Sequence, residues 1–104
     1  MNFDINEVTA NMLSAVQGTL KEDWDLVKKN ASIFIQNRKL RLELLTQMRI
    51  AGEISNDFFA KRLEDEKQLL VSELHAMVII NKVAAQNAAN AAIKVLEDAV
   101  KVVL

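Results

Sequence analysis

The chain has 104 residues, of which 51% are hydrophobic and 26% are charged, and its formal net charge at pH 7 is −1. This length fits a single domain, 1–104, and the composition is neither that of a disordered chain nor that of a membrane bundle. The near balance of charge argues against a nucleic-acid-binding protein, which normally carries a basic face. The sequence has no cysteine, so disulfides, thiolate catalysis and cysteine-based zinc sites are excluded.

The start of the chain has neither a basic segment nor an apolar stretch, so no signal peptide is predicted. The most apolar segment, Ala76–Leu104, is interrupted throughout by polar side chains. A membrane-spanning helix needs about 20 consecutive apolar residues, so we expect no such helix here. A cytoplasmic protein is therefore the default expectation.

A capping box opens the first predicted helix, because Asp4 can cap it and Glu7 follows three residues later. Apolar residues then recur every three or four positions with no proline among them, which predicts one long helix over about 5–50. The apolar row consists of Val8, Met12, Leu13, Val16, Leu20, Trp24, Val27, Ala31, Phe34, Leu42, Leu45 and Met48.

A turn is predicted at Ala51–Ser55. Gly52 suits the left-handed conformation that ends many helices, and Ile54 can pack back on the last turn. Ser55 is a good cap for the helix that follows. The sequence therefore predicts a helix–turn–helix joint at this point.

The apolar spacing after the joint predicts a second long helix over about 56–103. Two such helices form a long antiparallel hairpin with arms of about 70 Å. Pairing the arms from the turn outwards sets Arg38, Lys39 and Arg41 against the acidic run 64–66, where ion pairs can form. The alternative is a compact four-helix domain, in which the arms break at Gly18 and around 86–90.

The second arm carries more apolar surface than one partner helix can cover. Its polar residues trace one narrow row, so a second apolar face would be left in water, and such faces generally mark interfaces. We therefore expect a homo-oligomer, with a dimer that closes a four-helix bundle as the simplest form, or another protein partner. The expected self-association interface consists of Trp24, Ile79, Val83, Ala89, Ile93, Leu96, Val100 and Val103.

No catalytic, cofactor-binding or metal-binding residues are predicted. Carboxylate-bridged metal sites in helical bundles use a Glu-x-x-His pattern, whereas the only histidine, His75, has Glu73 two residues before it and on another face. A metal site of ferritin-like type built across a dimer axis stays open as an alternative.

The segment Asn87-Ala88…Ile93-Lys94-Val95-Leu96…Asp98 resembles the C-terminal helix of type III secretion needle subunits, which are themselves helical hairpins. The proline-containing turn of those subunits is absent, so membership of that family is not inferred. The resemblance adds weight to an assembly-forming role.

The sequence as a whole favours a non-enzymatic, self-associating helical protein that acts as a structural, adaptor or chaperone-like module. Two alternatives stay open beside it. One is a metal-binding four-helix bundle, and the other is a subunit of a secretion-type or phage-type filament or of a membrane-peripheral assembly.

Overall fold

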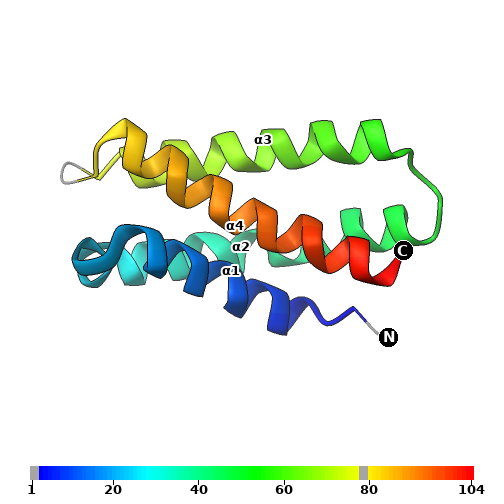
Figure 1. Cartoon of the computed structure of the whole chain (residues 1–104), viewed down its shortest axis with the longest axis horizontal. Helices are drawn as coiled ribbons and strands as arrows, with labels where there is room; N and C mark the ends of the chain where they lie inside the picture. Colours follow the sequence, from blue (N-terminus) through cyan, green and yellow to red (C-terminus); the bar gives the residue numbers. More distant parts are fainter. Residues whose placement is uncertain (1–2, 78–79) are drawn as a thin grey trace.

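The computed structural model describes residues 3–77 and 80–104, and this part of the chain forms four α-helices and one short 3₁₀ helix, with no strand (Figure 1). The prediction of an all-α chain is confirmed. The helices, in chain order, are α1 (Ile5–Leu20), η1 (Lys21–Asp23), α2 (Trp24–Ile50), α3 (Asn56–His75) and α4 (Lys82–Val103).

Successive α-helices run in opposite directions, and each packs against two neighbours. α1 lies between α2 and α4, and α3 also lies between α2 and α4, while the α1–α4 contact is the most extensive. This is the up-down-up-down arrangement of a helical bundle. Both ends of the chain and the turn at 51–55 lie at the same end of the bundle (Figure 1).

The prediction of unbroken helices over 5–50 and 56–103 is wrong, because each arm breaks and the hairpin is folded in half. The molecule is 41 Å long, well short of a 70 Å arm. The first break follows Leu20, where Lys21 has φ +55° and its N–H donates to the carbonyl of Gln17. Leu20 lies before this break and Trp24 after it, and both are buried. The apolar spacing in the sequence therefore continues across the break and does not indicate that the helix ends there.

The second break separates His75 from Lys82. Asn81 caps α4, since its side-chain oxygen accepts a hydrogen bond of 2.8 Å from the backbone N–H of Ala84. The alternative with breaks at Gly18 and at 86–90 is right about a compact bundle and wrong about both positions, because these residues lie inside α1 and α4.

The turn at 51–55 has the geometry that its residues predict. Gly52 has φ +78°, and its N–H donates to the carbonyl of Arg49 while that of Glu53 donates to Met48. These two bonds define a Schellman motif, which satisfies carbonyls at the end of α2. Ser55 accepts from the N–H of Phe58 at 3.1 Å, and the half-buried Ile54 packs against the core.

The hairpin folds in half into a four-helix bundle because α4 has two apolar sides that must be covered. Its buried residues include four alanines that are fully enclosed, and small side chains allow helices to approach closely. A single extended hairpin would cover one of these sides only. In the bundle α1 and α3 pack on either side of α4, so the surplus apolar face is covered by the chain itself. The enclosed alanines are Ala85, Ala88, Ala89 and Ala92.

The two glycines should respond in opposite ways to alanine. Gly18 lies inside α1 with open space around its α-carbon, so Gly18→Ala should raise the free energy of unfolding by up to about 1 kcal/mol. Gly52→Ala should lower it by about 1–2 kcal/mol, because an L side chain is strained at φ +78°. Urea unfolding followed by circular dichroism measures both, and a destabilising Gly18→Ala would contradict the assignment of residue 18 to a regular helix.

Candidate interaction surface

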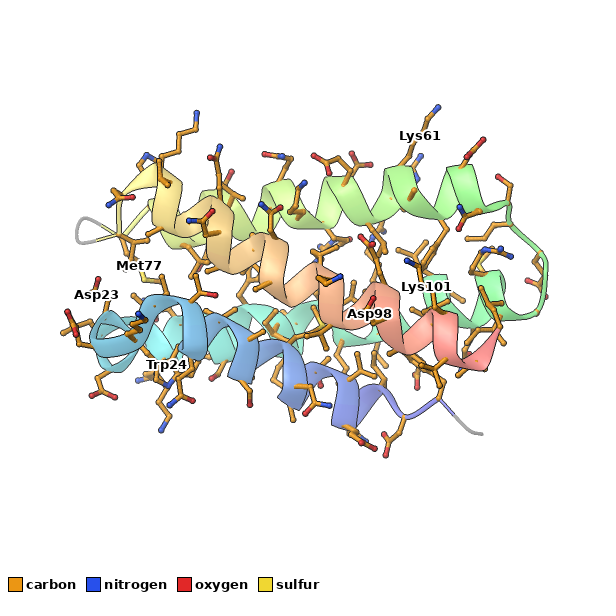
Figure 2. All side chains as sticks on the ribbon, viewed as in Figure 1. Asp23, Trp24, Lys61, Met77, Asp98 and Lys101 are labelled. Atoms are coloured by element: carbon orange, nitrogen blue, oxygen red, sulfur yellow. The ribbon has the colours of Figure 1, made fainter. Side chains whose placement is uncertain are left out.

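The residues predicted to form a self-association interface fall into two groups in the structure. Five of them, one on α2 and four on α4, are buried inside the single chain, so the expectation that they are left in water is wrong. Val83 is 65% exposed, Val103 is half-buried, and Ile79 lies outside the described residues. The five buried residues are Trp24, Ala89, Ile93, Leu96 and Val100, and Figure 2 labels Trp24.

Among the described helices, α2 has the largest set of exposed apolar side chains, while Phe58, Leu69, Val83, Val102 and Leu104 are exposed elsewhere. Four large side chains of this helix are exposed, namely Leu26 (66%), Ile33 (50%), Leu40 (78%) and Leu44 (58%). Their spacing of seven, seven and four residues places them on one side of an α-helix. We call these four residues the α2 stripe.

The α2 stripe lies on the side of the helix that faces away from the core. The buried side of α2 is formed by Val27, Ala31, Ile35, Leu42 and Leu45. At 100° per residue the centre of that side is roughly 150° from the stripe. Within residues 3–77 and 80–104, the stripe is therefore a helical face on which no other helix packs.

This surface was not predicted from the sequence, because the first arm was assigned a single apolar face at the positions that form the core. The signal was present in the seven-residue spacing of Leu26, Ile33 and Leu40. That spacing is typical of a coiled-coil seam, which needs only two apolar positions in seven.

The predicted ion pairs between the arms are confirmed for one buried carboxylate. Glu66 of α3 is 5% exposed, and it accepts hydrogen bonds from Arg38 Nε at 2.8 Å and from Arg41 Nε at 3.0 Å, both in α2. A second bond joins Arg38 to Glu66, and this hydrogen bonding raises the pKa of the Arg38 guanidinium. Glu64 and Asp65 face solvent and pair within α3, so the group is structural and ties α2 to α3.

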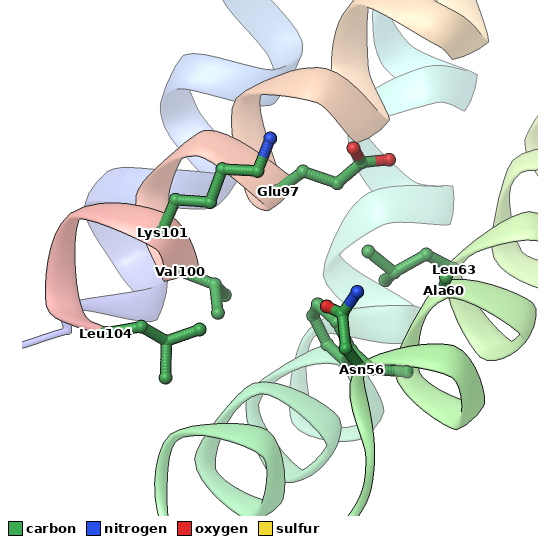
Figure 3. Close-up of a pocket in the computed structure, with 8 residues that line it drawn as sticks. Asn56, Ala60, Leu63, Glu97, Val100, Lys101 and Leu104 are labelled. Atoms are coloured by element: carbon green, nitrogen blue, oxygen red, sulfur yellow. The ribbon is translucent and has the colours of Figure 1, made fainter.

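Two open clefts lie near the end of α4. One, of about 200 Å³, lies between the start of α3 and the end of α4, and it has an apolar floor with Asn56, Glu97 and Lys101 at its rim (Figure 3). The other lies between residues 3–11 and the end of α4. Neither contains a histidine, and each brings together few polar groups, so both are places where apolar side chains are incompletely covered.

His75 does not belong to a cluster of metal-ligating groups. Its ring is exposed at the end of α3, with Nδ1 3.3 Å from the carbonyl oxygen of Ile80. Within residues 3–77 and 80–104, no three His, Asp or Glu side chains come together in a way that could hold a metal ion.

Comparisons with protein-family models, with curated proteins and with solved structures find no match. Among the described helices, none combines the length and apolarity needed to cross a bilayer.

The buried ion pair gives a sharp stability test. Glu66→Ala removes the partner of two arginines, of which Arg38 is largely shielded from solvent, so we expect a loss of about 2–3 kcal/mol in the free energy of unfolding. Glu64→Ala, at an exposed position of the same helix, should change it by less than about 0.5 kcal/mol. Equal effects of the two substitutions in urea unfolding would show that the arginine pair contributes nothing specific.

Proposed function

We propose that this protein is a non-enzymatic, self-associating helical interaction module, and that the α2 stripe is its contact surface. The observation that carries the proposal is the row of four large apolar side chains left exposed on the outer face of one helix. These side chains share one face of α2, with Asn30 and Asn37 between them, and apolar residues gathered on one face often mark an interaction site. The interface expected on α4 moves to α2 in this proposal.

The energy available from the stripe fits a weak association. Burying one fully exposed leucine or isoleucine contributes about 1.5–3 kcal/mol, and the stripe side chains are half to three-quarters exposed. Two copies that cover each other's stripe would gain roughly 8–16 kcal/mol before costs. Association itself costs about 4–15 kcal/mol, so a micromolar dissociation constant, which needs a net gain of about 8 kcal/mol, requires a cost near the lower limit of that range.

The same stripe could serve a peripheral membrane protein, because Lys28, Lys29 and Lys39 are also on α2. Asp25 and Glu43 offset only part of the positive charge of α2, which also carries Arg38, Arg41 and Arg49, although Arg38 and Arg41 pair with Glu66 of α3. Flotation with vesicles that contain anionic lipid distinguishes the two uses, and binding that competes with self-association would support the membrane alternative.

Leu40→Glu should abolish self-association without unfolding the chain. Leu40 is 78% exposed, so the substitution should change the free energy of unfolding by less than about 0.5 kcal/mol while it puts a charge in the stripe. Light scattering coupled to size-exclusion chromatography should show a concentration-dependent dimer for the parent chain and a monomer for the variant.

Val83→Glu is the matched control, because Val83 is similarly exposed but lies on α4 outside the stripe, and it should leave the dimer intact. Leu96→Glu should instead unfold the chain, since Leu96 is fully buried. A parent chain that stays monomeric up to about 1 mM would refute the proposed function.

A further inference from the structure

The α2 stripe belongs to a longer row that has the spacing of a coiled-coil seam. Leu26, Asn30, Ile33, Asn37, Leu40 and Leu44 follow one another at intervals of four or three residues, and all six are exposed. Alternation of four and three is the a/d pattern by which two helices pack side by side. The surface that fits such a row best is another helix with the same row.

We propose that the occupant of this face is α2 of a second copy of the chain, packed antiparallel with a two-fold axis at the level of Ile35. This inference rests on the proposed function and adds the partner and its register. In that register Leu26 lies opposite the partner subunit's Leu44, and Asn30 opposite the partner subunit's Leu40. Ile33 then lies opposite the partner subunit's Asn37. The two-fold axis creates each of these pairs twice in the dimer.

Charge complementarity selects this register. Lys29 and Glu43 flank the row on the same side, and in the described part of the chain neither makes a salt bridge. They are about 21 Å apart along α2, so they cannot meet within one copy. The antiparallel register brings Lys29 beside the partner subunit's Glu43, and the two-fold creates this pair twice. Between the two Lys29–Glu43 pairs, Gln36 lies opposite the partner subunit's Gln36.

A parallel pairing fits the charges less well. Asp23 lies three residues before Leu26 and continues the row, so a parallel pairing would place it against the partner subunit's Asp23. It would also leave Lys29 far from any Glu43. It would also align the two helix dipoles, whereas the antiparallel pairing opposes them. The parallel form would let Asn30 hydrogen-bond to its own equivalent, which makes it the competing arrangement to test.

The contact is self-complementary, so it closes at two copies. The same patch is used on both sides, which is the definition of an isologous interface, and no apolar part of the stripe is left over for a third copy. We therefore expect a dimer and no filament from this surface.

A charge swap tests the register. Lys29→Glu and Glu43→Lys should each weaken the dimer about five- to tenfold, because each puts like charges together twice. The variant that carries both substitutions should return to within about twofold of the parent, since opposite charges then face each other again across the dimer, with their signs exchanged. Analytical ultracentrifugation measures the dissociation constants, and circular dichroism confirms that these surface variants fold.

The outcomes separate this inference from the proposed function. Restoration by the double variant supports the antiparallel register, because residues 29 and 43 are too far apart to couple within one copy. A dimer that Leu40→Glu breaks but that no charge variant alters would overturn the register alone. A parent chain that is always monomeric overturns both.

Single cysteines distinguish the two directions of packing, because the chain has none of its own. Asn30→Cys and Leu40→Cys chains should form a disulfide with each other when they are mixed and oxidised, and neither should cross-link with itself. Self-cross-linking of Asn30→Cys would show the parallel arrangement and overturn the proposal. Val83→Cys, on α4, is the control for random collision.

Discussion

The architecture depends on how α4 is covered. Its fully enclosed alanines, Ala85, Ala88, Ala89 and Ala92, allow close packing, while Ile93, Leu96 and Val100 fill the space beyond them. One partner helix cannot cover both sides of such a surface, so the chain brings α1 to one side and α3 to the other. The breaks at Lys21–Asp23 and between His75 and Lys82 follow from this requirement, since only a hairpin folded in half places both helices there.

Covering α4 in this way determines which apolar residues stay outside. α2 lies diagonally across the bundle from α4 and uses one narrow side for the core. Its outer side holds the α2 stripe, which no helix of the described chain reaches. The buried Glu66, held by Arg38 and Arg41, fixes α2 against α3 and so keeps the stripe facing outward.

Sequence reasoning predicts those features whose chemistry is local. The joint at Gly52 and Ser55 and the cap at Asp4 each rest on a few adjacent residues, and the structure has all of them. The pairing of the arginines in α2 with Glu66 also follows, because it needs only the register set by that joint.

The breaks and the exposed stripe were not predicted, because they depend on the whole chain. A lysine at φ +55° carries no local signal, and Leu20 and Trp24 keep the apolar spacing intact across the break. Asn81 could have been read as a helix cap instead of a polar interruption. The α2 stripe was missed for a related reason, since its residues were not separated from the core positions of the same helix.

The preference of α1 for α4 also bears on how the chain folds. These helices are the most distant pair in the sequence, yet their contact is the most extensive in the bundle. Closing a long loop costs entropy, so this contact forms only when the two ends of the described chain meet. Neither end is then stable by itself, and folding should be all-or-none and slower than for a bundle whose strongest contacts join successive helices.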